Sequence, residues 1–185
     1  AIIPTGMLNE FGGYENDCML VRKSTSSYFM VSPSQQQTRT LEWMENRLPN
    51  DSTVALQDVH SMFSVLTVAG PKSKDLMQEM TNSDMDMHPF TYKYVNMGYA
   101  SGVMVFAVTQ TGEPGFSLYI PTEFALHLYD KIMSTGQGMV VSVSYSMIYC
   151  KAISAIKTPM GLFLEQDMNS NLYILLHLQI MASKT

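Results

Sequence analysis

The apolar positions in the first part of the chain predict a β-hairpin followed by a helix. Residues 18–21 and 28–31 are short apolar runs joined by a polar segment, as in a hairpin. Residues 32–35, Ser-Pro-Ser-Gln, have the order of a capping box, so we expect a helix from there to about residue 48. The residues at helical spacing that we expect to form its buried stripe are Leu41, Met44 and Leu48.

Five more strands and two more helices are predicted further along. The expected strands cover residues 54–56, 62–68, 90–95, 103–109 and 116–120. The second of these is largely apolar on both faces, which is typical of a central strand. One helix is expected at residues 72–80. The other begins at residues 121–123, has Phe124, Leu128 and Ile132 on one face, and ends at Gly136, which we expect as a left-handed cap.

Strand pairs that alternate with single helices indicate an α+β domain with mixed or antiparallel sheets and packed helices. The pattern weakens after residue 138. Residues 140–148 are a strand candidate there, and residues 172–181 a helix or a strand. We therefore expect one partial domain at residues 1–137 and a divergent C-terminal segment at residues 138–185.

Composition limits the classes of partner. The chain of 185 residues is 46% hydrophobic and 15% charged, as expected for a globular domain. Its net charge of -5 comes with basic residues scattered from Arg22 to Lys184, so we expect no nucleic-acid partner and no membrane surface. The apolar run at residues 172–181 is too short to span a bilayer, which takes about 20 residues. Cys18 and Cys150 form no disulfide framework, which favours a reducing compartment.

The sequence lacks the motifs of several common classes of enzyme. There is no dinucleotide-binding glycine motif, no P-loop and no G-x-S-x-G elbow. The four histidines are far apart in the sequence and have no metal-ligand spacing, so we expect no metal site; they are His60, His88, His127 and His177. We expect Cys18 to be a small buried hydrophobic residue of a strand rather than a nucleophile.

Two glycine-rich turns each carry a carboxylate. Asp17 follows the turn at residues 9–13, where it would either cap that turn or hydrogen-bond an amine, and its spacing favours capping. Glu113 lies in the turn at residues 109–116 and is expected to be solvated or to accept from nearby backbone amides. The residues alone thus predict an α+β domain with two glycine-rich carboxylate turns.

These two turns, about a hundred residues apart, resemble the signatures of the aminomethyltransferase (glycine-cleavage T-protein) family. The first signature is matched by Met7, Leu8, Asn9, Gly12, Gly13 and Asp17, with Asn16 in place of an aspartate. The second is matched by Thr111, Gly112, Glu113 and Gly115. Gly70-Pro71 is a third match, and the resemblance spans about residues 3–137. It implies a folate-binding domain of several α+β subdomains around a central ligand channel, here without its N-terminal subdomain.

The resemblance also implies a ligand and a site. It places Asp17 beside the reacting end of tetrahydrofolate, as the catalytic residue if the site is active. The implied folate pocket comprises Asn9, Gly12, Gly13, Asp17, Gly112 and Glu113. Pro4 and Gln110 stand in place of two tyrosines, and Ser117 stands in place of the glutamate that holds the pteridine. Each buried polar group left unpaired costs about 1–3 kcal/mol, so we expect weakened folate binding. FAD belongs to an upstream domain of dehydrogenase relatives.

Other segments resemble a regulatory branch of this family, which restrains a mitochondrial phosphatase through protein contacts. They are residues 13–18, 29–33, 98–102, 111–116, 118–121 and 125–127. This implies a non-catalytic regulatory module of the mitochondrial matrix whose partner is the phosphatase catalytic subunit. Two alternatives stay open. One is a folate-dependent one-carbon transferase that uses Asp17, and the other is a truncated product without activity of its own.

Overall fold

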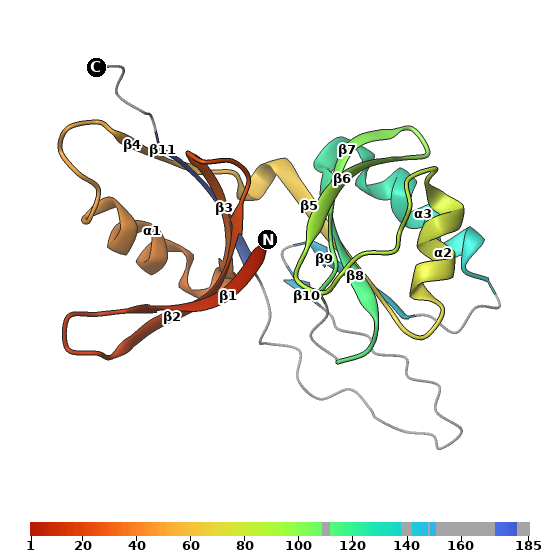
Figure 1. Cartoon of the computed structure of the whole chain (residues 1–185), viewed down its shortest axis with the longest axis horizontal. Coiled ribbons are helices and arrows are strands. Elements are labelled where there is room, and N and C mark those ends of the chain that lie inside the picture. The colour runs from red at the N-terminus through yellow and green to blue at the C-terminus, as the bar shows by residue number, and fades with distance from the viewer. Residues whose placement is uncertain (109–111, 138–141, 148, 151–172, 181–185) are drawn as a thin grey trace. The chain divides into compact units, whose positions relative to one another are not determined.

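The computed structural model describes residues 1–108, 112–137, 142–147, 149–150 and 173–180 (Figure 1). The chain divides into two compact units. The first unit comprises Ala1–Ser61 and Asn171–Thr185, and the second comprises Met62–Ser170. Each unit contains one antiparallel sheet with helical packing, which confirms the α+β class.

The sheet of the first unit has five antiparallel strands in the order β1-β2-β3-β11-β4. Their bounds are β1 Ile2–Leu8, β2 Tyr14–Arg22, β3 Ser27–Pro33, β4 Val54–Asp58 and β11 Tyr173–Ile180. Strands β2 and β3 form the predicted hairpin, which is longer at both ends than the apolar runs indicated. The segment predicted as helix or strand at residues 172–181 is a strand where it is described, and it pairs with both β3 and β4.

The predicted capping box is wrong. Ser32 and Pro33 belong to β3 and lie in register with β11, so their backbone stays extended. A short 3-10 turn, Ser34–Gln36, follows, and helix α1 spans Gln37–Glu45. The residue before α1, Gln36, makes no side-chain cap hydrogen bond. Pairing with a strand that is distant in the sequence has overridden a local helix signal.

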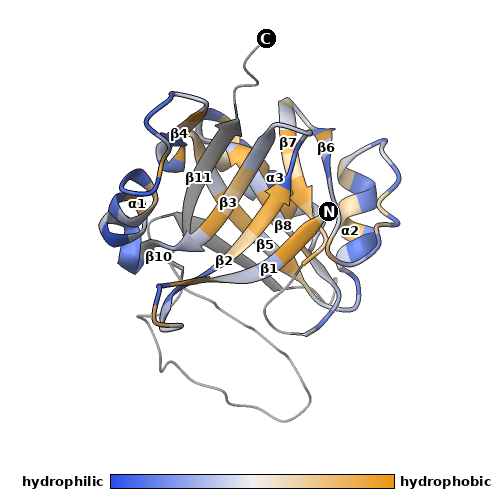
Figure 2. Cartoon of the chain, turned by 60° about the vertical axis from the view of Figure 1, so that its left-hand side comes forward, coloured by the Kyte–Doolittle hydropathy of each residue, from blue (hydrophilic) through white to orange (hydrophobic). Residues whose placement is uncertain are grey.

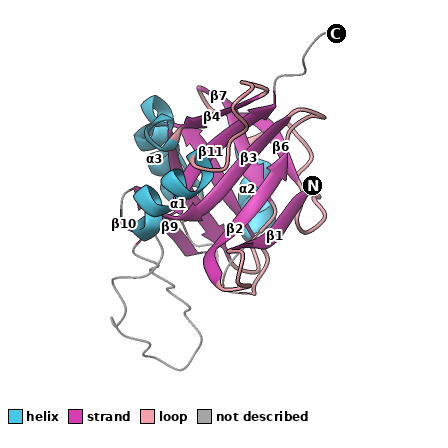
Figure 3. Cartoon of the chain, turned by 90° about the vertical axis from the view of Figure 1, so that its left-hand side faces the viewer, coloured by secondary structure: helices cyan, strands magenta, loops and turns pink. Residues whose placement is uncertain are grey.

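Helix α1 packs on one face of this sheet (Figure 3). The small core between them contains Met7, Cys18 and Met30, surrounded by Leu20, Leu41, Trp43, Met44 and Leu56. Two residues of the predicted stripe, Leu41 and Met44, thus face this core but are only partly buried, whereas Thr40 is the buried residue of α1. Most of α1 is hydrophilic, in contrast with the hydrophobic residues along β2 and β3 (Figure 2).

The sheet of the second unit has the strand order β10-β9-β5-β8-β7-β6, also antiparallel. The bounds are β5 Phe63–Ala69, β6 Tyr92–Met97, β7 Ala100–Phe106, β8 Gly115–Pro121, β9 Ser142–Met147 and β10 Tyr149–Cys150. A 3-10 turn, His60–Met62, precedes β5. Strand β5 pairs with β8 on one side and β9 on the other, which confirms the predicted central strand.

Helices α2 (Ser73–Met80) and α3 (Ala125–Thr135) pack on one face of the second sheet. A 3-10 turn, Thr122–Phe124, leads into α3. The predicted apolar face of α3 is confirmed for Leu128 and Ile132, which are fully buried, whereas Phe124 lies in the 3-10 turn and is only partly buried against the same core. The left-handed cap is wrong, because Gly136 has a φ of -79° and donates its N–H to the Ile132 carbonyl at 2.8 Å.

Candidate functional site

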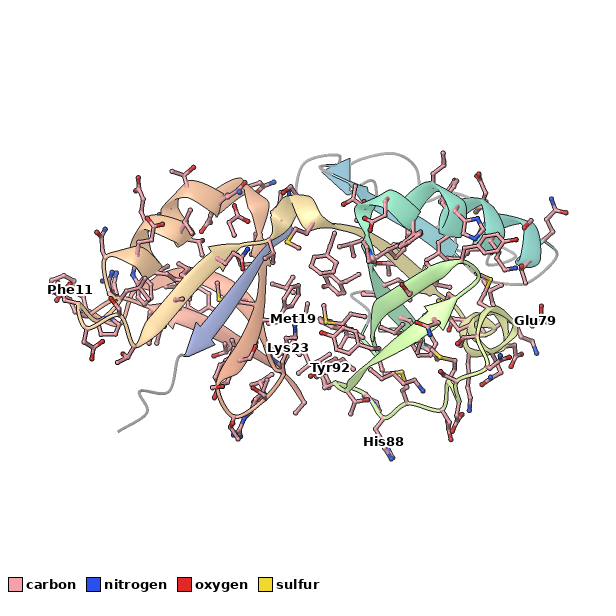
Figure 4. The ribbon with its side chains drawn as sticks, turned by 90° about the horizontal axis from the view of Figure 1, so that it is seen from above. Phe11, Met19, Lys23, Glu79, His88 and Tyr92 are labelled. Carbon is pink, nitrogen blue, oxygen red and sulfur yellow. The ribbon has the colours of Figure 1, made fainter. Side chains whose placement is uncertain are left out.

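The first glycine-rich turn is built around the side chain of Asn9. Its Oδ1 accepts hydrogen bonds from the backbone N–H of Phe11 at 3.1 Å and of Gly13 at 2.7 Å. The backbone closes the same turn, with Gly12 donating to the Asn9 carbonyl at 3.0 Å. Gly12 has a φ of +76°, a conformation that favours glycine. The turn leaves Phe11 exposed at its outer end (Figure 4).

Strand β2 carries a β-bulge next to this turn. Along most of β1 each residue faces one residue of β2, but the register shifts after Met7, so that Leu8 faces Tyr14. Glu15 is the extra residue, and two residues of β2 there occupy the space of one on β1. Side chains alternate between the faces of a strand, so this insertion turns Tyr14 to the same face as Asp17.

Tyr14 and Asp17 contact each other on that face. The Tyr14 hydroxyl donates a hydrogen bond to Oδ1 of Asp17. Gly6 lies opposite Asp17 on β1, and the tyrosine ring lies over it. A Cβ at Gly6 would overlap the hydroxyl oxygen and Cζ of that ring. The missing side chain of Gly6 therefore provides the room in which Tyr14 reaches the carboxylate.

This contact changes the interpretation of Asp17. The sequence favoured Asp17 as the cap of its turn, but Asn9 caps the turn and Asp17 accepts from Tyr14 instead. The hydrogen bond to Asp17 raises the pKa of the Tyr14 phenol above its ordinary value of 10.0, helped by desolvation and by the carboxylate charge. The protonated phenol is the form that the carboxylate stabilises.

The opposite face of β2 is tied to α1. Glu15 accepts from the Asn9 amide at 3.0 Å and forms an ion pair with Arg39 of α1. These two hydrogen bonds, that of Asn9 first, lower the pKa of the Glu15 carboxyl. Asn16, where the family signature has an aspartate, is buried and donates to the hydroxyl of buried Thr40 at 2.7 Å. Asn16 therefore joins the strand to the helix and points away from the face of Asp17.

Cys18 follows Asp17 in β2 and faces the small core. Burial raises the pKa of its thiol, and the charge of Asp17 adds to the same effect. A thiol with a raised pKa carries little thiolate at neutral pH, so it is a poor nucleophile. The prediction of a small buried residue in a strand is confirmed.

The second glycine-rich turn lies in the second unit and is held by the start of α2. The Pro114 carbonyl accepts hydrogen bonds from the Gly70 backbone N–H at 2.9 Å and from the Ser73 hydroxyl at 3.1 Å. Gly112 has a φ of +76°, and Glu113 follows it just before β8 begins. Gln110, the position of a family tyrosine, lies outside the described residues.

Aromatic residues gather on the face of the second sheet opposite α2 and α3. Tyr92, Phe106 and Ser117 lie in register across β6, β7 and β8, and so share this face. The ring centroids of Tyr92 and Phe106 are 5.9 Å apart, and those of Phe106 and Tyr119 are 4.3 Å apart. The Ser117 hydroxyl, at the position of the pteridine-binding glutamate, donates to the Val108 carbonyl at 3.3 Å.

The predicted site residues thus fall into two groups. Asn9, Gly12, Gly13 and Asp17 form one turn and strand start in the first unit. Gly112 and Glu113 belong to the second unit. Sequence reasoning missed Tyr14 as a partner of Asp17, because plain strand alternation places the two on opposite faces. Gly6, the glycine beneath the Tyr14 ring, indicates this contact only once the structure is known.

Neither a metal-binding cluster nor a membrane-spanning helix is found among the described residues. No group of three or more histidine, cysteine, aspartate or glutamate side chains there could hold a metal ion. Within the same ranges, no helix has the length and hydropathy needed to cross a membrane.

Tetrahydrofolate, which the resemblance implies, fits the described residues poorly. The Asp17 carboxylate already accepts from Tyr14, and Ser117 directs its hydroxyl to a backbone carbonyl. Pro4 lies two residues from Gly6 on β1 and offers no hydroxyl. A ligand would have to compete with Tyr14 for Oδ1 of Asp17 and would find no carboxylate at position 117.

A family model described as "GCVT N-terminal domain" matches residues 2–151. Over 139 residues the chain is 46% identical to the "Pyruvate dehydrogenase phosphatase regulatory subunit, mitochondrial" of Mus musculus. This alignment covers 74% of this chain and 16% of the mouse protein. The chain is 28% identical over 138 residues to an aminomethyltransferase of Caldanaerobacter subterraneus subsp. tengcongensis, covering 74% of this chain and 36% of that protein.

Among solved structures, the glycine cleavage system aminomethyltransferase T from Bartonella henselae aligns with a TM-score of 0.46 and 13% identity, over 70% of this chain and 42% of that chain. The chain spans less than half the length of each of these relatives.

Proposed function

Because the chain belongs to the GCVT N-terminal domain family, we propose that it is a non-catalytic regulatory or binding module that acts on the catalytic subunit of pyruvate dehydrogenase phosphatase. The identity of 46% to the mouse regulatory subunit carries this proposal, since aminomethyltransferase relatives reach 28% over a segment of similar length. The state of Asp17, engaged by Tyr14, agrees with a scaffold that has lost its chemistry.

The proposed action is a protein contact that restrains the phosphatase. The mitochondrial matrix is the compartment proposed for it, in line with the mitochondrial name of the mouse relative. Residues 1–137 are proposed as the part that carries the family scaffold, with residues 138–185 as a divergent segment.

The test begins with purified chain that unfolds cooperatively on heating. This chain is added to the phosphatase catalytic subunit, and activity is measured across a titration of the metal on which that activity depends. We expect the metal dependence to shift and direct binding to be detectable by calorimetry. Unchanged activity together with no measurable binding would rule the proposal out.

A second candidate is a folate-dependent one-carbon transferase. One observation favours it, since Asp17 retains the carboxylate of the family signature and is exposed. This candidate requires the unmutated chain to form methylenetetrahydrofolate and Asp17→Asn to abolish that activity. Undetectable turnover by the unmutated chain would eliminate it.

A further inference from the structure

We propose that Tyr14 competes with a ligand's amine nitrogen for Oδ1 of Asp17, and so weakens the binding of tetrahydrofolate at this carboxylate. The proposal rests on the proposed function in one respect, because it assigns a cause to the absence of catalysis. It concerns a contact within the first unit and needs no residue of the second.

Three features of the hairpin build the contact. The bulge at Glu15 turns Tyr14 to the face of Asp17. Gly6, directly opposite Asp17, leaves space for the ring, since a Cβ there would overlap it. The hydroxyl then reaches Oδ1 of the carboxylate. A bulge that re-aims a side chain beside a functional position is a common device in sheets.

The neighbouring carboxylate shows that the arrangement is specific to Asp17. Glu15 is one residue beyond Tyr14 but faces α1, where Asn9 and Arg39 bind it. Asn9 also holds the turn that precedes Tyr14. These contacts on the α1 side of β2 hold the turn and the bulge from which Tyr14 approaches the carboxylate, and an amine must compete with a partner that is already in place.

The contact itself is tested by titrating the tyrosines in the ultraviolet. Subtracting the Tyr14→Phe curve from that of the unmutated chain isolates Tyr14. We expect its pKa to lie above the ordinary value of 10.0 and to fall toward that value in Asp17→Asn, since the charged acceptor is then lost. An identical Tyr14 titration in both backgrounds overturns the proposal.

The blocking role is tested by calorimetry with tetrahydrofolate. Tyr14→Phe removes the hydroxyl and keeps the ring, and we expect about three- to tenfold tighter binding than for the unmutated chain, below the range for a hydrogen bond to a buried charged group because both side chains are exposed. Adding Asp17→Asn should cancel the gain. Tyr99→Phe is the matched control, because Tyr99 is an exposed tyrosine of the second unit, and it should leave affinity unchanged.

Gly6→Ala gives an independent route to the same state. Its Cβ would displace the Tyr14 ring while keeping both polar groups, so affinity should rise as in Tyr14→Phe. Equal affinity in Tyr14→Phe and the unmutated chain, including no binding by either, overturns the blocking role, and weaker binding would make Tyr14 a ligand residue instead. Failure of the proposed function is distinguishable, since it appears as no effect of the unmutated chain on the phosphatase, whatever Tyr14 does.

Discussion

The two units bury their described residues in different ways. In the second, α2 and α3 cover one sheet face over a cluster of sixteen buried apolar residues. In the first, α1 covers a cluster with three such residues, Met7, Cys18 and Met30. A buried polar pair, Asn16 and Thr40, lies beside that smaller cluster. Apolar burial is non-directional, whereas hydrogen bonds fix geometry. The sheet face beneath α1 in the first unit therefore depends more on hydrogen bonds than the sheet face beneath α2 and α3 in the second unit.

Apolar burial in the second unit and hydrogen bonding in the first predict different effects of mutation. Loss of apolar volume in the second unit should cost the most free energy of unfolding. Loss of a polar contact in the first unit should cost less but should change the position of the site residues.

Leu118→Ala should have the largest effect. Leu118 is fully buried in β8 within the large cluster, and truncating such a residue removes transfer free energy and leaves a cavity. The expected loss in free energy of unfolding is about 2–5 kcal/mol, measured by urea denaturation followed by circular dichroism. Leu8→Ala, at a residue that is 52% exposed on β1, is the control and should cost less than about 0.5 kcal/mol. Similar losses for the two variants would contradict the comparison.

Asn16→Ala should come next, with a loss of about 1–3 kcal/mol, because it leaves the buried Thr40 hydroxyl without its donor. The same denaturation measurement applies. Thr40→Val added to Asn16→Ala should recover part of the loss, since no unpaired polar group then remains. A double variant as unstable as the sum of the two single variants would show that the pair is not coupled.

The accuracy of the sequence-based predictions differs between the two units. The strands and helices of the second unit were predicted because their apolar periods are local and strong, as in β5 and α3. Errors arose where pairing between strands distant in the sequence determines the local structure. Ser32 and Pro33 pair with β11 and stay extended, although a capping box predicted the start of a helix there. The site residues of the first turn were identified by resemblance. Their contacts were not, because one inserted residue, Glu15, reverses the face of Tyr14 and no periodicity reveals a bulge.

Two glycines with positive φ give a third test. Gly98 has a φ of +57°, and a Cβ there would be 2.9 Å from Nε2 of His127. Gly12 has a φ of +76° and nothing within 4 Å of such a Cβ. Each change to alanine places a non-glycine residue in a left-handed backbone conformation, which costs about 1–2 kcal/mol. Gly98→Ala should cost more by thermal denaturation, because the Tyr99 N–H also donates to that histidine nitrogen at 3.4 Å. A larger loss for Gly12→Ala would contradict this ranking.

The smallest effect concerns the carboxylates and their pH dependence. The pKa of Glu15 is lowered in the folded chain, first by the Asn9 amide and then by Arg39, and that of Asp86 in the second unit is lowered by Lys74. A lowered folded pKa means that the stabilisation is present above the ordinary carboxyl value and is lost as pH falls through the folded value. Thermal stability should therefore differ between the unmutated chain and Glu15→Gln at neutral pH, and the difference should vanish in acid.

Salt then separates the two carboxylates. Asp86 and Lys74 form an exposed ion pair, with 76% and 52% of their side chains accessible, so about 1 M salt should remove the stability difference caused by Asp86→Asn. The Glu15 side chain is only 14% exposed, and one of its donors is the neutral amide of Asn9. A hydrogen bond from a neutral group is screened less than an ion pair, so the stability difference caused by Glu15→Ala, which removes the oxygen that accepts from Asn9, should persist in salt. If both differences disappeared together, the turn of the first unit would depend on charge rather than on hydrogen-bond geometry.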